Sequence, residues 1–313
     1  MSSYRASDGA AAALNAPLVQ VMMPDLELRE ERGVVVRQAA QVMDAVGQVT
    51  GCCYQPQTRF TVSSMPPGKR AAKNHDVLDP DRWSPTHEEL ERLPPAFVIE
   101  EQSQAWVRTC LALWGGLNLR PMTMHMRAKA GREDIPDHYT IQRPWRCGGR
   151  CCCPLEMSVF ARHRGEGADL VGRVEEFWPG DPVGYCTRCF QTCCYCTTTH
   201  NVLAFDKARG ALVHKYSLRT DTGCFGRNNN CCGSTCLKKD LIMDVLDASG
   251  AMVGNMQKTY APGGGAGACC RCMFQYGNFI VDFPEAASED ERALLLTALL
   301  NTEFQLWERQ GGE

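Results

Sequence analysis

The chain has 313 residues and is 44% hydrophobic, which is enough to bury one large core or two ordinary ones. Its net charge of −3 gives no overall basic field, so nucleic acid is not an expected partner. The chain has nineteen cysteines, an odd number, and its start lacks a signal-peptide pattern. Both features argue against a disulfide framework, so we expect the cysteines to be thiols, lipidation sites or metal ligands.

Residues 1–33 are rich in alanine and loosely patterned, and Pro17 and Pro24 limit the length of any helix there. We expect a flexible N-terminal extension. From residue 34 the pattern changes to short β-like runs, broken by glycine and proline, that predict strands. The first of these runs are 34–38, 41–46 and 59–62.

The stretch 65–96 has a different composition. It contains six prolines and many charged residues, which is typical of an exposed segment. We expect a Pro-rich insertion or linker here, and we regard it as the candidate surface for a protein partner.

Strand-like runs resume after the insertion, at 97–100, 106–108, 122–126, 156–160, 169–174, 201–205, 212–216, 241–246, 252–256 and 279–283. The turns at 206–210 and 247–250 have hairpin chemistry. A dozen or so short strands followed by one apolar helix predict a mainly β protein. We expect one domain, 34–310, that forms a closed antiparallel β-barrel of about twelve strands around a central hydrophobic C-terminal α-helix.

The helix is predicted over 288–310. Ser288 and Glu291 have the spacing of a capping box. Between residues 293 and 300 only Thr297 is polar, so the helix is apolar on every side and needs to be surrounded. A membrane-spanning helix is the alternative, but spanning needs roughly 20 apolar residues and this run ends at Asn301. The expected core residues are Leu294, Leu295, Leu296, Leu299 and Leu300.

A motif in the middle of the chain carries a family resemblance. Arg143-Pro144-Trp145-Arg146-Cys147 is followed by the run Cys151-Cys152-Cys153 and then Pro154. This order resembles the middle of the phospholipid scramblase family, which reads Arg-Pro-x-Arg-Cys, two small residues, a cysteine run with proline, and a strand. Further matches follow the family's order, at Gly172-Arg173-Val174, Pro182-Val183-Gly184-Tyr185, Val245-Leu246-Asp247 and Asn278-Phe279. The resemblance covers 34–64 and 97–309, with 65–96 inserted.

The resemblance implies a tubby-like fold, in which a twelve-stranded barrel closes around a hydrophobic C-terminal helix. It also implies association with membrane phospholipids and their calcium-triggered movement between leaflets. The expected location is the cytosolic face of a membrane, with the plasma membrane as the first choice.

The resemblance further implies palmitoylation of the cysteine run, Cys151, Cys152 and Cys153. Each buried methylene of an acyl chain adds about 0.8 kcal/mol, so two or more adjacent chains would hold the protein firmly on a membrane. Near an anionic leaflet, positive charge beside the run would add to this attraction. The neighbouring arginines are Arg143, Arg146 and Arg150. A loop of unmodified thiols is the alternative.

Calcium is where the sequence departs from the family. The family's proposed loop opens with two aspartates one residue apart and has an acid near its end, and the matching positions here are Gln275, Gly277 and Ala286. Calcium takes about six to eight oxygen ligands, several of them from carboxylates. The oxygen donors that this segment keeps are Asn278, Asp282 and Glu285. We expect a strand in which Asp282 is a solvated acid. The alternative is a degenerate calcium site formed by Asn278, Asp282 and Glu285.

The spacing Cys186-x₂-Cys189-x₃-Cys193-x₂-Cys196 suggests zinc, because paired knuckles can supply four thiolates. Zinc ribbons, however, separate their two pairs by about 15 to 20 residues, and a shorter spacing suits a single tetrahedral site poorly. We therefore expect ordinary thiols here rather than zinc, with a structural metal site as the alternative.

No nucleophile elbow, phosphate-binding loop or His-Glu-x₂-His motif is present, so we do not expect an enzyme. The leading hypothesis is a scramblase-like protein that moves phospholipids in both directions without ATP. The alternative is a transport-inactive scaffold that binds lipids or phosphoinositides, with Lys238-Lys239, Arg162 and Arg164 as candidate basic groups. A metal-stabilised regulatory module is a third hypothesis.

Overall fold

The computed structural model describes residues 28, 31–38, 58–71, 83–102, 121–128, 138–145, 155–161, 169–176, 197–221, 241–259 and 277–306, and every structural statement below concerns these residues.

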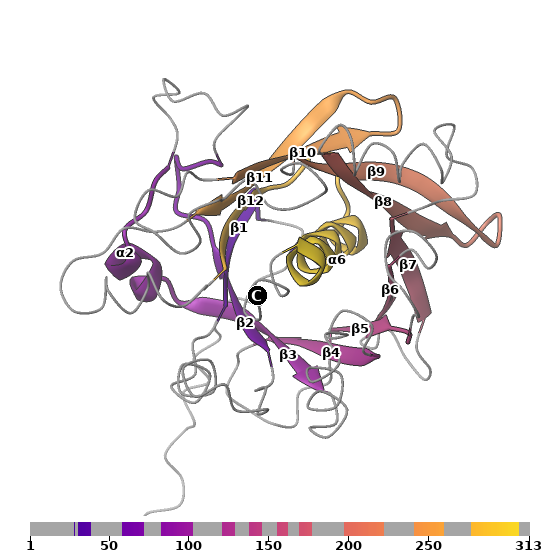
Figure 1. Ribbon diagram of the computed structural model, residues 1–313, viewed down its shortest axis with the longest axis horizontal. Coiled ribbons are helices and arrows are strands. Elements are labelled where there is room, and N and C mark those ends of the chain that lie inside the picture. The colour runs from indigo at the N-terminus through magenta and orange to yellow at the C-terminus, as the bar shows by residue number, and fades with distance from the viewer. Residues whose placement is uncertain are drawn as a thin grey trace, which may run out of the picture.

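Twelve antiparallel strands form a closed barrel, which Figure 1 shows end-on with helix α6 inside it. Each strand pairs with its neighbours in sequence, and β1 closes the barrel by pairing with β12. The prediction of a mainly β, closed antiparallel barrel of about twelve strands is confirmed. The strands are β1 (Gly33–Gln38), β2 (Arg59–Ser64), β3 (Pro95–Gln102), β4 (Met122–Ala128), β5 (Tyr139–Arg143), β6 (Glu156–Ala161), β7 (Asp169–Glu175), β8 (Thr197–Asp206), β9 (Ala211–Asp221), β10 (Leu241–Asp247), β11 (Met252–Thr259) and β12 (Asn278–Asp282).

Strand β5 is absent from the sequence-based expectation. It is short, and Gln142 and Arg143 at its end hide the alternation of apolar and polar residues that identifies a strand. The strands predicted at 41–46 and 106–108 lie outside the described residues.

Alternation along the strands separates the barrel interior from its outer wall. In β4, Met122, Met124 and Met126 are buried in the core, whereas His125 and Arg127 make polar contacts on the outside. This follows from the pleat, because successive strand side chains point to opposite faces. The inward residues of all twelve strands meet around α6 in one apolar core.

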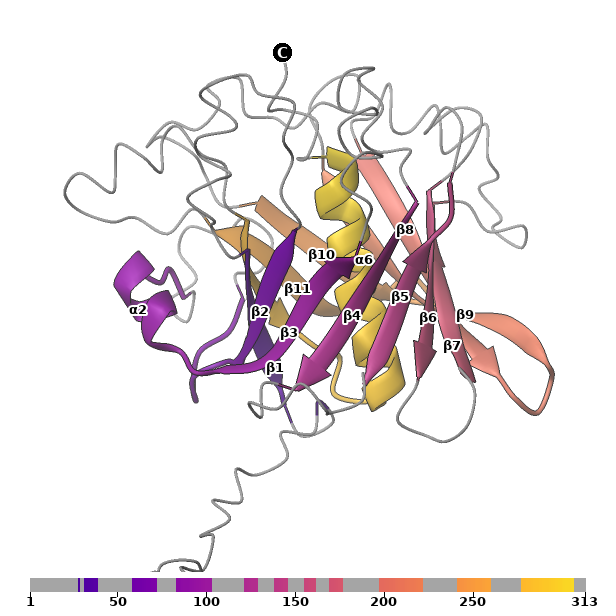
Figure 2. The ribbon, with the colours of Figure 1, turned by 90° about the horizontal axis from the view of Figure 1, so that it is seen from below.

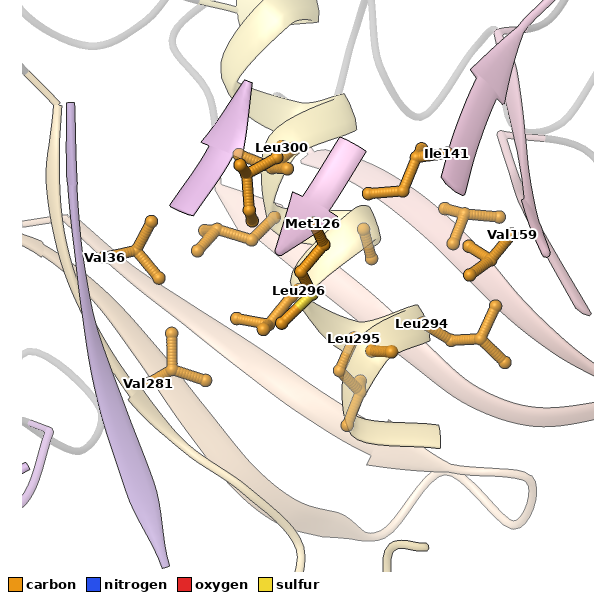
Figure 3. Close-up of a cluster of buried hydrophobic side chains, with 14 of the residues drawn as sticks. Val36, Met126, Ile141, Val159, Val281, Leu294, Leu295, Leu296 and Leu300 are labelled. Carbon is orange, nitrogen blue, oxygen red and sulfur yellow. The ribbon is translucent and has the colours of Figure 1, made fainter. Parts of the chain in front are cut away.

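Helix α6 (Glu289–Leu306) lies along the barrel axis, as Figure 2 shows. Its first turn has the predicted capping box, in which Glu291 N donates to Ser288 Oγ and Ser288 N donates to Glu291 Oε2. Strand residues such as Val36, Met126 and Val159 surround the helix (Figure 3). The predicted core leucines, each at most 1% exposed, are Leu294, Leu295, Leu296, Leu299 and Leu300. Burying one leucine side chain stabilises the fold by roughly 1.5–3 kcal/mol.

Gly172 in β7 sets how closely the helix approaches the barrel wall. A Cβ at this position would lie 2.8 Å from Leu294 Cδ1 and 2.2 Å from the carbonyl oxygen of Leu203. Both distances are too short for a real side chain, so only glycine fits here.

The insertion 65–96 is not simply an exposed linker. Ala71, Trp83 and Leu90 pack on the outside of the barrel against Val35 of β1 and Ile280 of β12, in a second apolar cluster. The short helix α2 (His87–Arg92) begins with a capping box between Thr86 and Glu89. Proline and charge dominate the composition of this stretch and conceal the few apolar residues that anchor it.

The segment predicted as a flexible N-terminal extension is also fixed at its end. Leu28 is 1% exposed and belongs to the main core. The guanidinium of Arg292, near the start of α6, donates to the carbonyl oxygens of Leu28 and Glu31. The backbone at Leu28 and Glu31 is therefore tied to the base of the helix, while residues 1–27, 29 and 30 lie outside the described residues.

Candidate functional site

The two ends of the barrel differ in sequence. Because neighbouring strands are antiparallel, each connection from an odd-numbered strand to the next even-numbered strand is attached at the same end. We call it the cysteine end, because all nineteen cysteines fall in these connections. The connections are 39–58, 103–121, 144–155, 176–196, 222–240 and 260–277.

The cysteines themselves lie outside the described residues. The same is true of the predicted lipidation run Cys151, Cys152 and Cys153, of the Cys186–Cys196 spacing, and of the candidate basic groups Arg162, Arg164, Lys238 and Lys239. In the part of the chain that the structure does describe, no three His, Cys, Asp or Glu side chains lie close enough together to hold a metal ion.

Helix α6 becomes polar as it approaches the cysteine end, yet it stays inside the barrel. Lys258 of β11 donates to Glu303 over 2.8 Å, and the two side chains are 3% and 10% exposed. The Lys258 ammonium also lies 5.3 Å from the ring centroid of Phe279. Desolvation lowers the pKa of Lys258, while the charge of Glu303 opposes this shift.

Further polar contacts hold the same part of the helix. Thr302 Oγ1 lies 3.1 Å from Nδ1 of His200 in β8. Gln305 donates to Glu176, just beyond β7, over 2.6 Å. The fully buried amide of Asn301, by contrast, has no hydrogen-bond partner among the described residues. The lumen is therefore apolar around the leucines and polar around the last helical turn and a half.

Arg143 belongs to this lumen and not to the membrane-facing group in which the sequence placed it. It is 3% exposed, and its guanidinium lies 5.8 Å from the ring centroid of Phe304. Alternation in β5 explains this, because Tyr139, Ile141 and Arg143 all point inward. Arg146 and Arg150 lie outside the described residues.

The structure separates two of the three degenerate calcium residues. Asn278 and Asp282 lie at opposite ends of β12, four residues and so about 13 Å apart, whereas two oxygens that bind one calcium ion lie at most roughly 5 Å apart. Asp282 points away from Phe279 and Val281, as predicted, and its side chain is partly exposed. Its Oδ2 accepts a hydrogen bond of 2.9 Å from the backbone N–H of Ala71 in the insertion.

A groove of about 500 Å³ opens on the outer wall at the cysteine end. A row of amide and hydroxyl side chains crosses four adjacent strands there, each directly opposite the next: Gln102, Thr123, Gln142 and Ser158. Glu156 and Phe160 of β6 also line it, and Glu156 lies 3.8 Å from Arg173.

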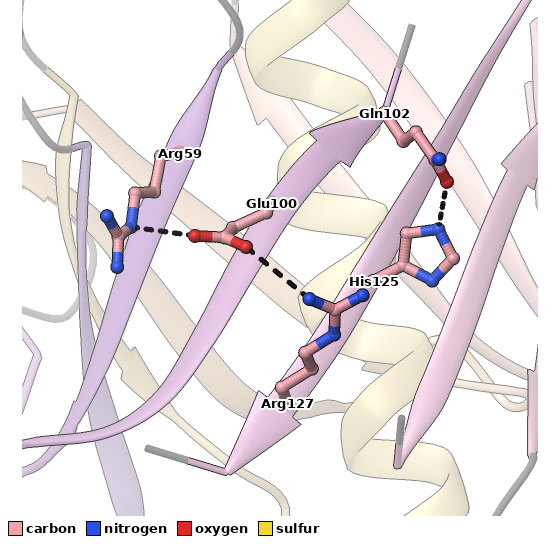
Figure 4. Close-up of polar contacts among 5 residues, drawn as sticks. All are labelled: Arg59, Glu100, Gln102, His125 and Arg127. Atoms are coloured by element: carbon pink, nitrogen blue, oxygen red, sulfur yellow. Dashed lines mark hydrogen bonds and ion pairs between the residues drawn. The ribbon is translucent and has the colours of Figure 1, made fainter. Parts of the chain in front are cut away.

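Charged pairs continue along this wall toward the other end, as Figure 4 shows. Glu100 lies 3.1 Å from Arg59 and 3.8 Å from Arg127, and His125 Nε2 lies 2.8 Å from Gln102 Oε1. The ion-paired side chains are nearly half exposed, so each pair contributes only about 0–1 kcal/mol. The wall is thus a polar surface, and sequence reasoning missed its groove because the lining residues come from four separate strands.

Trp145 follows β5 at the cysteine end and is 58% exposed. Among the helices of the described residues, none combines the length and the apolar character needed to cross a membrane.

The sequence is similar to a known protein. Phospholipid scramblase 1 from Mus musculus is 26% identical over 198 residues, which are 62% of this chain and 47% of the scramblase. The matched part thus spans about half the length of this curated relative. No family model matches the chain. No solved structure matches it either.

Proposed function

We infer that this chain, a distant relative of the phospholipid scramblases, promotes ATP-independent, bidirectional movement of phospholipids between the leaflets of a membrane. The sequence similarity to phospholipid scramblase 1 carries this proposal. The closed barrel around a buried C-terminal helix supports it, because this is the architecture that the family resemblance implies. The expected site of action is the cytosolic face of the plasma membrane.

The task of such a protein is physical rather than covalent. A phospholipid crosses the bilayer slowly because its polar headgroup has to leave water for hydrocarbon, where unpaired polar groups are strongly disfavoured. Amides and hydroxyls both donate and accept hydrogen bonds, so the row from Gln102 to Ser158 can replace part of the water around a headgroup. We propose that the groove at the cysteine end contacts the headgroup in this way, and we assign no residue a catalytic role.

Palmitate and calcium enter as further parts of the proposal. Acylation of Cys151, Cys152 and Cys153 would anchor the chain close to the groove, because this run lies between β5 and β6, two of the strands that line it. Calcium dependence would require a site to which Asn278 and Asp282 do not both contribute, because they lie at opposite ends of β12.

The proposal is tested by reconstituting the full chain in liposomes that carry a fluorescent phospholipid in both leaflets. Dithionite quenches only the outer leaflet, so a protein that exchanges lipids exposes the inner signal as well. The assay is run with calcium and with a chelator. We expect quenching beyond the outer-leaflet fraction in at least one of the two conditions.

The groove is tested with the double variant Thr123→Val/Gln142→Leu, which removes hydrogen-bonding groups from the middle of the row. We expect exchange to slow several-fold. The matched control is Thr199→Val on β8, a strand that does not line the groove. Equal rates for the double variant and wild type would remove the groove from the mechanism.

The second candidate function is a lipid-binding scaffold without transport. It is favoured by the position of α6, whose apolar surface is already covered by the barrel and is not offered to lipid. Liposomes that bind the protein but show no leaflet exchange at any calcium concentration would exclude scrambling and leave the scaffold. A partner would then have to recognise the outer wall or the insertion.

A further inference from the structure

Strand β6 forms one side of the groove on the outer wall. Its inward residues Met157 and Val159 belong to the core, so the residues between them face outward. Starting from the cysteine end, the outward residues that line the groove are a carboxylate, a hydroxyl and an aromatic ring: Glu156, Ser158 and Phe160. The groove therefore has an acid at one edge and neutral hydrogen-bonding groups across the adjacent strands.

The charge beside this edge is negative. Glu156 lies 3.8 Å from Arg173 Nη1, and the same guanidinium nitrogen lies 3.9 Å from Glu175. One guanidinium thus faces two carboxylates, which leaves a formal charge of −1. Both distances are longer than a hydrogen bond. Because a carboxylate can accept about four hydrogen bonds, Glu156 can accept from a ligand in addition to its present contacts.

The groove has no matching cation for an anionic ligand. Among the described residues that line it, Arg143 is the single lysine, arginine or histidine. The Arg143 side chain is 3% exposed, and its guanidinium lies in the lumen beside Phe304. A headgroup with only negative charge would therefore meet the Glu156 carboxylate without a compensating positive group on the wall of the groove.

The lining suits a primary ammonium better than a quaternary one. A primary ammonium has three N–H donors and no acceptor, and each polar lining side chain of the row carries an oxygen that can accept. A quaternary ammonium has no N–H group and is recognised by several aromatic faces. Phe160 is the single aromatic ring among the described lining residues, so the groove is no aromatic cage.

The adjacent strand provides donors for a phosphate. The amide of Gln142 and the hydroxyl of Thr123 can both donate to phosphate oxygens. Gln142 lies directly opposite Ser158, one strand spacing or about 4.8 Å away. In an ethanolamine headgroup only two carbons separate the ammonium from the phosphate ester. An ammonium held at β6 thus places its phosphate over β5.

We propose that the groove selects phospholipid headgroups that carry a primary ammonium and no net negative charge, as phosphatidylethanolamine does, and that Glu156 determines this preference. The inference rests on the proposed lipid-moving function and adds to it the class of lipid. Glu156 and Ser158 accept from the ammonium, and Gln142 and Thr123 donate to the phosphate. The complex forms through hydrogen bonds and charge alone.

The test measures headgroup binding without a membrane. Full-length protein is titrated with short-chain dihexanoyl lipids below the concentration at which they form micelles, and binding is followed by saturation-transfer NMR. The lipids carry a primary ammonium, a quaternary ammonium or no ammonium: phosphatidylethanolamine, phosphatidylcholine and phosphatidylglycerol. We expect the first to bind several-fold more tightly than the other two. This ranking by the wild type tests the proposal without a variant.

Three variants locate the source of the preference. Glu156→Gln should remove it, because the amide is neutral. The matched control is Glu100→Gln, which removes a carboxylate between Arg59 and Arg127 on the same wall but outside the groove (Figure 4), and should keep the preference. Thr123→Val/Gln142→Leu should weaken all three lipids alike, because each of them carries the phosphate.

Four results would each overturn the proposal: no binding of any of the lipids, equal affinities for the three, tighter binding of phosphatidylglycerol, or an equal loss of preference in Glu156→Gln and Glu100→Gln. A preference for phosphatidylethanolamine in a protein that shows no leaflet exchange in liposomes would keep this inference and reject the scrambling activity. Leaflet exchange by a protein without the preference would keep the activity and reject the inference.

Discussion

At the scale of single residues, the lumen combines an apolar core with a buried ion pair. Lys258 and Glu303 face each other over 2.8 Å and link β11 to the last part of α6. A buried pair contributes little net stability compared with apolar residues, but removing one partner leaves a buried charge alone, which destabilises a protein by about 3–5 kcal/mol. The pair therefore acts mainly to fix where the polar end of the helix sits.

We predict that Glu303→Leu lowers the free energy of unfolding by about 3 kcal/mol or more, whereas Lys258→Met/Glu303→Leu recovers most of the loss. Equilibrium urea unfolding of wild type, both single variants and the double variant measures this. A double variant as unstable as the worse single variant would show that packing, not charge, is decisive.

The same pair predicts a pH dependence. Desolvation lowers the pKa of Lys258 below 10.5, its usual value, and Glu303 opposes the shift. Between the lowered pKa and 10.5 the unfolded chain binds more protons, so stability rises with pH in this window. Glu303→Leu removes the opposing charge and should steepen the rise. A flat alkaline profile for this variant would contradict the shift.

At the scale of elements, the described residues form two apolar clusters with different structural roles. The inner cluster holds α6 in the barrel, and the outer cluster holds the insertion on β1 and β12. The outer attachment is helped by Asp282, which accepts from Ala71 N, and by Gln257, which donates to the carbonyl oxygen of Trp83 over 3.4 Å. The insertion is thus a docked element with its own anchors.

We predict that Trp83→Ala detaches the insertion without unfolding the barrel. Hydrogen exchange should become faster over 83–94, while α6 keeps its protection, because the outer cluster can open locally. Leu296→Ala is the contrast, since a cavity beside the central helix should destabilise the whole barrel by about 2–5 kcal/mol. Simultaneous loss of protection in α6 and in 83–94 on Trp83→Ala would show a single cooperative unit.

At the scale of the whole molecule, the two ends of the barrel differ, because the cysteine-containing connections are all attached at one of them. Much of this difference comes from which connections are attached at each end. In a closed antiparallel barrel, successive connections alternate between the two ends. Alternate connections in the sequence can therefore give the two ends different residue compositions.

Acylation should act at this scale. We predict that in cells Cys151→Ala/Cys152→Ala/Cys153→Ala removes most palmitate and shifts the protein from the membrane to the soluble fraction, because one chain anchors only marginally. Acyl exchange labelling and fractionation measure the two effects. Cys269→Ala/Cys270→Ala/Cys272→Ala, in another connection at the same end, is the control. If the Cys151→Ala/Cys152→Ala/Cys153→Ala variant kept wild-type levels of palmitate and of membrane binding, these cysteines would not be the membrane anchor.

Much of the fold follows from local patterns. Alternation predicted most of the strands, and the capping box at Ser288 with the leucines after it predicted a helix that had to be enclosed. These signals work because the pleat, the helix cap and apolar burial depend on residues close together in sequence.

The site depended on tertiary structure. Nothing in the sequence around Arg143 shows that it enters the lumen, that Asp282 pairs with Ala71, or that Lys258 meets Glu303. Each contact joins segments far apart in the chain, so its partner is set only when the barrel closes. The sequence by itself determined an apolar helix inside a sheet and a chain full of cysteines. Only antiparallel closure decided that the cysteine-containing connections and the polar groove share one end, because the end at which a connection is attached depends on the pairing of all the strands.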